Sequence, residues 1–191
     1  MQRVNAYPWL LQGNHRQAVV AHLFQPSTAR QLAHLLGVGT DACMKALWGL
    51  TIYELVRCLN PAAPASRLYW LTAMGVQCQR RLRQELGLPP FRHDLPRIDW
   101  SLYGSVCFSH RAAIIKALTE PLQPATIKRR ALQRDPQLRM SANNVRDVIR
   151  LFQKRDVVRP IHFRGHKHIR YELTDLGREL RNLLLRAEVG R

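Results

Sequence analysis

The sequence predicts a mainly helical α+β protein in which two similar small domains follow one another, each with a small β-hairpin. Three observations predict this class: the two halves are similar to each other, helical apolar spacing alternates with short β-rich runs in the same order in both, and 191 residues suffice for two small domains. We expect an N-terminal domain over residues 1–88, a linker and lead-in over 89–108, and a C-terminal domain over 109–191.

The internal repeat is visible in two aligned segments. Residues 14–23 (NHRQAVVAHL) resemble residues 109–118 (SHRAAIIKAL) at an offset of 95, and residues 69–75 (YWLTAMG) match residues 171–177 (YELTDLG) at an offset of 102. The second offset also superimposes apolar residues without a gap, for example Leu47 on Ile149 and Leu50 on Phe152. Apolar positions agree while polar ones differ, as expected of two copies that keep a core. The seven additional residues of the second copy fall between its first and third helices.

Each copy contains the same succession of predicted elements. Three helices come first, over residues 15–24, 28–36 and 41–53 in the first copy and over 110–118, 125–132 and 142–155 in the second. Two β-rich runs follow, over 55–59 and 68–71, and over 157–163 and 169–173. A Leu-Thr-x-x-Gly segment then leads into a closing helix, over 76–86 and 178–188. Thr40 and Ser141 are the predicted N-caps of the two third helices, since hydroxyl side chains favour that position.

Three helices followed by a hairpin is the order of a winged helix-turn-helix domain, so we predict two such domains in tandem. Residues 57–61 (RCLNP) and 67–75 (RLYWLTAMG) resemble the hairpin of the winged helix-turn-helix domains in prokaryotic transcription regulators of the MarR and ArsR kind. The resemblance covers residues 14–86 and 109–188. It implies a DNA-binding fold whose third helix enters the major groove.

The charge of the chain points to a polyanionic partner. Thirty Lys and Arg residues against thirteen Asp and Glu residues give a net charge of +17, and the excess is larger in residues 96–191 (20 basic, 9 acidic) than in residues 1–95 (10 basic, 4 acidic). Such a field attracts nucleic acid, and we expect double-stranded DNA as the partner. A device for solubility or an acidic membrane surface is the alternative explanation.

The third helix of the second copy carries the residues best suited to reading bases. Helical spacing turns Asn143, Asn144, Arg146, Asp147 and Arg150 outward, and asparagine pairs with adenine while arginine pairs with guanine. An ordinary solvated helix face is the alternative. The predicted DNA contacts of the C-terminal domain lie in its second helix, its third helix and its wing: Lys128, Arg129, Arg130, Ser141, Asn143, Asn144, Arg146, Arg150, Arg164, His166, Lys167, His168 and Arg170.

The first copy departs from this pattern. Met44 and Trp48 occupy outward positions of its third helix, and residues 61–66 of its wing are uncharged. Exposed apolar side chains of this kind are typical of protein interfaces, so we expect Met44 and Trp48 to meet a protein partner or a second copy. Alternatively, Trp48 packs against a neighbouring helix. Lys45 and Arg67 are the predicted DNA contacts of this domain.

Other sequence patterns argue against an enzyme, a cofactor or a metal site. No glycine-rich phosphate loop, H-E-x-x-H motif or nucleophile elbow occurs, so we expect neither an enzyme nor a cofactor. Three alternating histidines of the second wing are a poor metal site, and the four cysteines, none in a C-x-x-C pair, are expected mostly in the core. Arg80, Arg81 and Arg83 are expected on a solvated face of the closing helix.

The sequence therefore predicts a cytoplasmic, nucleoid-associated protein that regulates transcription by binding specific DNA. No apolar run approaches the length of about 18 residues that a membrane span requires, and we expect no membrane partner. Two alternatives remain: a scaffold that binds proteins through its winged helices, and an architectural or replication protein that binds nucleic acid.

Overall fold

The computed structural model describes residues 6–91, 97–162 and 168–189. The chain is about 60% helical, with small antiparallel sheets of two and three strands, which confirms the mainly helical α+β class. It divides into two compact units, one formed by residues 1–104 with 186–191 and the other by residues 105–185. Among the described residues, no helix combines the length and the apolar character needed to cross a membrane.

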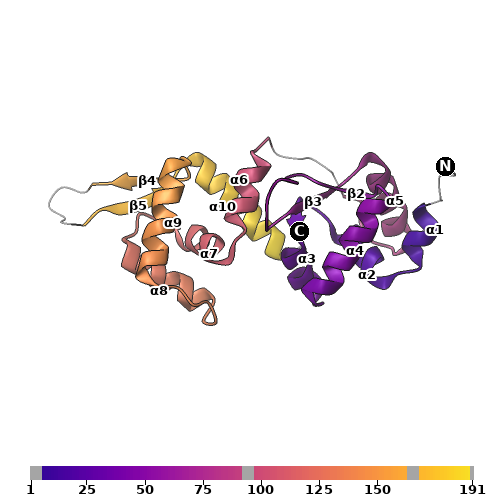
Figure 1. Cartoon of the computed structure of the whole chain (residues 1–191), viewed down its shortest axis with the longest axis horizontal. Helices are drawn as coiled ribbons and strands as arrows, with labels where there is room; N and C mark the ends of the chain where they lie inside the picture. The colour runs from indigo at the N-terminus through magenta and orange to yellow at the C-terminus, as the bar shows by residue number, and fades with distance from the viewer. Residues whose placement is uncertain (1–5, 92–96, 163–167, 190–191) are drawn as a thin grey trace. The chain divides into compact units, whose positions relative to one another are not determined.

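The elements follow the same order in both units (Figure 1). The first unit contains α1 Ala6–Leu11, α2 Asn14–His22, β1 Ser27–Thr28, α3 Ala29–Leu36, α4 Thr40–Ile52, β2 Val56–Cys58, β3 Leu68–Leu71 and α5 Ala73–Glu85. The chain continues through α6 Trp100–Val106, α7 Ser109–Ala117, α8 Pro124–Arg134, α9 Ala142–Lys154, β4 Val158–Ile161, β5 Arg170–Leu173 and α10 Asp175–Val189. The offsets of 95 and 102 residues bring α2 onto α7 and α4 onto α9 from end to end.

The strand pairing is repeated as well. In the first unit β3 lies between β1 and β2, with Ser27 opposite Tyr69. In the second unit β4 pairs with β5, and Leu122 forms an isolated bridge to Tyr171 through hydrogen bonds of 2.9 and 2.8 Å. Leu122 and Tyr171 are the repeat equivalents of Ser27 and Tyr69, so the bridge is the counterpart of the β1–β3 pairing.

A threonine cap fixes the turn from β3 into α5. The Thr72 hydroxyl donates a hydrogen bond of 2.5 Å to the carbonyl oxygen of Glu54 and accepts one of 3.1 Å from the Gly75 amide. A Cβ atom at Gly75 would stand 1.9 Å from the carbonyl oxygen of Leu55. Glycine is therefore required here, because no side chain fits between the helix start and the residue before β2.

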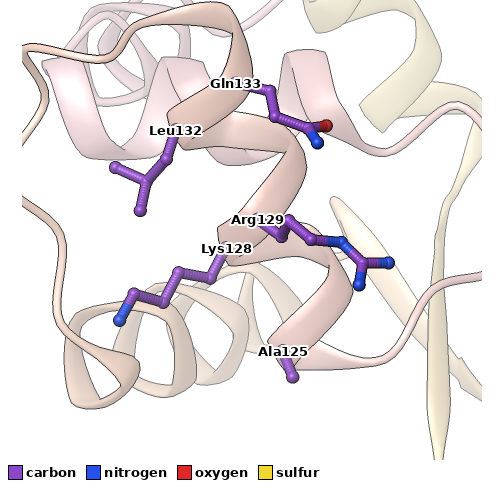
Figure 2. Close-up of a pocket in the computed structure, with 5 residues that line it drawn as sticks. All are labelled: Ala125, Lys128, Arg129, Leu132 and Gln133. Atoms are coloured by element: carbon purple, nitrogen blue, oxygen red, sulfur yellow. The ribbon is translucent and has the colours of Figure 1, made fainter.

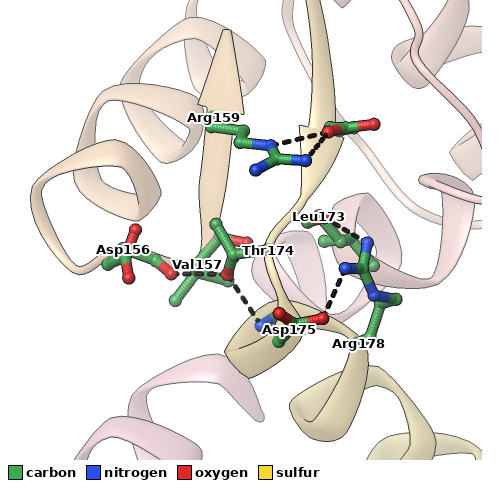
Figure 3. A network of polar contacts seen from close by, with 9 residues as sticks. Asp156, Val157, Arg159, Leu173, Thr174, Asp175 and Arg178 are labelled. Carbon is green, nitrogen blue, oxygen red and sulfur yellow. Dashed lines mark hydrogen bonds and ion pairs between the residues drawn. The ribbon is translucent and has the colours of Figure 1, made fainter.

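The second unit repeats this cap (Figure 3). Thr174 donates to the carbonyl oxygen of Asp156 at 2.6 Å and accepts from the Gly177 amide at 3.1 Å, and a Cβ atom at Gly177 would stand 2.1 Å from the Val157 carbonyl oxygen. Asp156 has a φ of 53° and its equivalent Glu54 a φ of 56°. The Leu-Thr-x-x-Gly segment is thus a structural signature of both units.

The cores use the apolar positions that the repeat predicts. Leu47 and Leu50 of α4 are fully buried, and their equivalents in α9, Ile149 and Phe152, are at most 2% exposed. Burying side chains of this size is the main favourable contribution to folding, about 1.5–3 kcal/mol each. The predicted register between the two copies is therefore confirmed in the core.

One predicted N-cap is wrong, and three elements were not predicted. The N-cap of α4 is Gly39, without a side-chain hydrogen bond, and Thr40 is already the first residue of the helix. Helix α6 lies inside the expected linker and lead-in, while α1 and β1 were not predicted. Two of the four cysteines, Cys43 and Cys78, are buried, and the other two are half-buried.

Candidate nucleic-acid interface

Helix α9 has one apolar and one polar face. Val145, Ile149 and Phe152 are buried. The exposed face carries Asn143, Arg146, Asp147, Arg150 and Lys154. Helical spacing predicted the first four of these positions, and Lys154 extends the exposed cationic row by one more turn. The helix thus presents three cations and one carboxylate to solvent.

Asn144 has a different environment from its neighbours. It is half-buried, and its Oδ1 atom accepts hydrogen bonds from the Ser141 backbone amide at 2.9 Å and from the Ser141 hydroxyl at 2.8 Å. The Ser141 hydroxyl in turn accepts from the Asn144 amide at 3.1 Å. The predicted N-cap at Ser141 is confirmed, as part of a capping box that satisfies the first amides of the helix. Both side chains therefore stabilise the helix start, which the prediction of outward base readout by Asn144 did not foresee.

The two arginines of α9 each contact a neighbour one turn earlier. Arg146 donates to the Asn143 Oδ1 atom at 3.2 Å, and Arg150 pairs with the Asp147 carboxylate at 3.3 Å. The side chains of Arg150 and Asp147 are 73% and 68% exposed, so this ion pair contributes little stability. Because a guanidinium group has five N–H donors, each arginine keeps donors for an external acceptor.

Helix α8 carries two neighbouring cations, Lys128 and Arg129 (Figure 2). Lys128 and Leu132 extend to one side of the helix, and Arg129 and Gln133 to the other. Together with Ala125 they line a shallow hollow of about 410 Å³ on this helix. Arg129 is exposed and Lys128 is half-buried, so Arg129 is the more accessible of the two predicted phosphate contacts.

Arg130 is engaged within its own unit. It donates to the Thr119 hydroxyl at 2.9 Å and pairs with the Glu120 carboxylate at 2.5 Å. Its side chain is 35% exposed, against 57% for Glu120. Since a carboxylate already compensates this cation, Arg130 is less suited to phosphate contact than the two residues before it.

The β4–β5 hairpin carries further cations. Arg159 is exposed and pairs with Glu172 across the hairpin at 2.5 Å (Figure 3). His168 is exposed and Arg170 half-buried. The predicted wing residues Arg164, His166 and Lys167 lie outside the described residues. Among the residues that are described, no three His, Cys, Asp or Glu side chains gather as metal ligands would.

Helix α4 has an apolar exposed face where α9 has a cationic one. Met44, Trp48 and Ile52 are 47%, 71% and 57% exposed. We call these three residues the α4 stripe, because a spacing of four places them along one side of the helix. The predicted exposure of Met44 and Trp48 is confirmed, and the alternative that Trp48 packs against a neighbouring helix is wrong.

The cationic candidates of the first unit are isolated. Lys45 is exposed on α4. Arg67 is exposed, and its Nε atom donates to the Ala63 carbonyl oxygen at 3.2 Å, within the uncharged loop 61–66. The buried Asn60 fixes the two ends of this loop: its side chain donates to the Ser66 carbonyl oxygen and accepts from the Leu68 amide. These two cations form no row comparable to that of α9.

Arg83 is a structural residue that the sequence did not reveal. Arg80 and Arg81 are exposed as expected, but Arg83 is only 6% exposed and donates to the carbonyl oxygens of Ala21 and Pro89 at 2.8 and 2.6 Å. Burial lowers the pKa of its guanidinium group. This side chain ties the segment after α5 to α2, so it belongs to the fold and not to a solvated face.

No protein-family model, no curated protein and no solved structure matches this chain.

Proposed function

We propose that this protein binds double-stranded DNA as a sequence-specific transcription regulator, using α9 and the β4–β5 hairpin of its second unit. In this proposal each unit is a winged helix-turn-helix domain, with α4 or α9 as third helix and the β2–β3 or β4–β5 hairpin as wing. The repeated order of helices and strands supports this assignment. A nucleoid-associated location in the cytoplasm follows from the proposal.

One observation carries the proposal: the exposed face of α9 is a row of cations at helical spacing. Arg146, Arg150 and Lys154 follow one another at intervals of four residues and are all exposed. A row of this kind can follow a phosphate backbone, and arginine can also form paired hydrogen bonds with guanine. Asn143, at the start of the helix, adds an amide of the kind that pairs with adenine.

In this proposal the elements beside α9 supply contacts to the DNA backbone, which position the protein but do not recognise bases. Lys128 and Arg129 project from α8, the helix before α9. His168 is exposed on the hairpin side, and Arg159 is exposed there but already pairs with Glu172. In a helix-turn-helix domain the helix before the recognition helix crosses the DNA backbone, so cations there contact phosphates and fix the register.

A second candidate function has an observation in its favour. The α4 stripe is typical of a protein interface, which would suit a scaffold protein that binds partners through its winged helices. An architectural or replication protein would use the same cations as the regulator. Salt-dependent binding to a duplex separates the scaffold from the DNA binders, and dependence on base sequence separates the regulator from the others.

The experiment is fluorescence anisotropy with a labelled mixed-sequence duplex, at salt concentrations from about 50 to 200 mM. We expect binding that weakens steeply with salt in the wild type and collapses in an Arg146→Ala/Arg150→Ala variant. The matched control is Arg30→Ala/Arg80→Ala, which also removes two exposed arginines but takes them from α3 and α5 of the first unit. Absence of duplex binding at low salt, or equal losses in the two variants, would contradict the assignment to α9.

A further inference from the structure

Asp147 is the one acidic residue of helix α9, and it lies within the cationic row of that helix. The thirteen residues of α9 include Arg146, Arg150 and Lys154 beside this single carboxylate. The Asp147 side chain is 68% exposed and shares the outer face of the helix with these cations. A carboxylate repels phosphate groups, so at this position it lowers the affinity for any polyanion that approaches the face. A surface that only had to hold phosphates would not carry it.

The fold of the unit does not require Asp147. Its equivalent 102 residues earlier is Lys45, which is also exposed, on a helix of the same length and core register. The position therefore accepts either charge. The capping box of α9 is formed by Ser141 and Asn144 without it. The ion pair with Arg150 joins two largely exposed side chains and contributes little stability. The carboxylate is thus better explained by what α9 contacts than by what holds it.

The pairing of Asp147 with Arg150 places a hydrogen-bond acceptor beside a donor on the outer face of α9. The Arg150 Nη1 atom lies 3.3 Å from the Asp147 Oδ1 atom. An ionised carboxylate can only accept hydrogen bonds, and a guanidinium group can only donate them. Because Asp147 has a second oxygen atom and Arg150 has further N–H groups, both can also bond a ligand that offers a donor beside acceptors.

A C·G base pair offers this pattern in the major groove. Cytosine presents the N4 amino donor there, and the guanine paired with it presents two acceptors, O6 and N7. Guanine and thymine would offer the carboxylate only acceptors. Adenine has an amino donor, but its N7 acceptor lies next to that donor and repels a carboxylate. Cytosine is therefore the base that suits Asp147 best, and its partner guanine suits Arg150.

We propose that Asp147 is a specificity-determining residue, which accepts a hydrogen bond from the N4 amino group of one cytosine while Arg150 donates to the guanine paired with it. Asp147 can have this role only if α9 binds DNA as proposed above, so the role rests on the proposed function. The carboxylate then acts in two ways. It selects the C·G pair, and it weakens binding to other sequences because it stays unmatched beside phosphates and base acceptors.

Asp147→Asn is the sharpest variant, because it keeps the size of the side chain and replaces one carboxylate oxygen by an amino group. The amide has no charge and can bond adenine as well as cytosine. We therefore expect Asp147→Asn to bind unselected duplex several-fold more tightly than the wild type. The matched control is Glu179→Gln, which also removes one exposed carboxylate from the second unit but takes it from α10. Both variants have the same net charge.

The test is selection, by the full chain, of duplexes from a pool with a randomised central segment, followed by anisotropy on the enriched site. The wild type and Glu179→Gln should enrich sites with a C·G pair at one fixed position. Exchanging that pair for each of the other three should weaken wild-type binding about tenfold, and binding of Asp147→Asn less than about threefold. Asp147→Asn should keep the preferences at the remaining positions. Circular dichroism establishes that both variants keep the helical content of the wild type.

The outcomes separate the role of Asp147 from DNA binding itself. If the wild type binds no duplex, or enriches no sequence, the proposed function fails and the role of Asp147 fails with it. If the wild type enriches a site and Asp147→Asn enriches the same site with the same preferences, only the role of Asp147 is overturned. Equal gains in affinity for unselected duplex in Asp147→Asn and Glu179→Gln would also overturn it, since the gain would then come from net charge alone.

Discussion

Helices α4 and α9 occupy the same place in their units and differ in what they present to solvent. Both have thirteen residues, and both bury equivalent apolar side chains. The exposed positions of α4 hold methionine, tryptophan and isoleucine, whereas those of α9 hold two arginines and a lysine. One scaffold therefore carries a neutral apolar face in the first unit and a cationic face in the second.

This comparison shows which positions of the fold tolerate substitution. The positions that agree between the units are those that the backbone and the core require, including the threonine cap and the glycine beside it. The outward positions of the α4 stripe and their equivalents in α9 differ and are exposed, whereas differing positions such as Asn144 and Arg83 serve the fold of one unit only. Function is therefore expected to follow the exposed differing positions, and stability the shared ones.

The largest expected effect concerns the shared glycines. Gly75→Ala and Gly177→Ala should each lower the free energy of unfolding of their unit by about 3 kcal/mol, because the new methyl group would collide with a backbone carbonyl oxygen. Gly39→Ala is the control, since a Cβ atom there meets nothing within 4 Å and only the smaller cost of an alanine N-cap, about 1 kcal/mol or less, is expected. All four tryptophans lie in residues 1–104, so tryptophan fluorescence in urea follows the first unit. Hydrogen exchange follows the second. Equal stability of wild type and either variant would contradict the shared role.

The next effect tests the differing positions by exchanging them. Arg146→Met/Arg150→Trp/Lys154→Ile gives α9 the surface of α4, and we expect duplex affinity to fall about 100-fold and the slope of log affinity against log salt to lose up to about 3. The reciprocal variant, Met44→Arg/Trp48→Arg/Ile52→Lys, should bind duplex at least as well as the wild type. Anisotropy measures both. If the Arg146→Met/Arg150→Trp/Lys154→Ile variant binds duplex like the wild type, the cationic face of α9 has no role in DNA binding.

The repeated parts of this fold were predicted well because each apolar position and each turn could be compared between two copies. The core register of α4 and α9 and the Leu-Thr-x-x-Gly cap were read from two aligned copies. By contrast, the seven-residue helix α6 and the two-residue strand β1 are too short to show a clear period. Their ends depend on tertiary contacts, such as the pairing of Ser27 with Tyr69, which no local pattern encodes.

The candidate site was predicted in part for a related reason. Helical spacing placed Asn143, Arg146, Asp147 and Arg150 on the exposed face of α9 correctly, because the face of a helix follows from its period. Spacing alone did not reveal the capping role of Asn144, the pairing of Arg130 with Glu120, or the buried guanidinium of Arg83. These depend on which acceptor lies within reach of a long or polar side chain once the chain has folded.

A smaller effect concerns the starts of the two helices. Ser141→Ala should destabilise the second unit by about 1 kcal/mol, because it removes the capping box of α9. Thr40→Ala changes the residue that the sequence predicted as the cap of α4 and should be close to neutral, since Gly39, the equivalent of Ser141, caps α4 without a side chain. Urea unfolding followed by circular dichroism and hydrogen exchange measures both. Equal destabilisation by the two changes would contradict this difference in capping.

The smallest expected effect is a dependence of stability on pH that arises from Asp175 in the second unit. Asp175 begins α10, and its hydrogen bond of 2.5 Å from Arg178 holds the pKa of that carboxyl below its usual value. A lowered pKa in the folded state gives stability that is present above the usual pKa and is lost as pH falls through the lowered one. Asp175→Asn should therefore reduce the loss of stability between about pH 5 and pH 2, measured as urea midpoints.

The equivalent residue of Asp175 in the first unit is Ala73, which has no carboxyl to titrate. Arg178→Gln should reproduce the flattened pH profile of Asp175→Asn, because it removes the same pair from the other side. An acid profile that neither change alters would show that the pair makes no contribution to folding.

Hydroxyl-radical footprinting of the chain with and without duplex DNA tests the contrast between the two helices most directly. We predict that DNA protects the side chains of α9, among them Arg146 and Arg150, while Met44 and Trp48 of α4 stay as reactive as in the free protein. Protection of Met44 and Trp48 with an unchanged α9 would contradict the account.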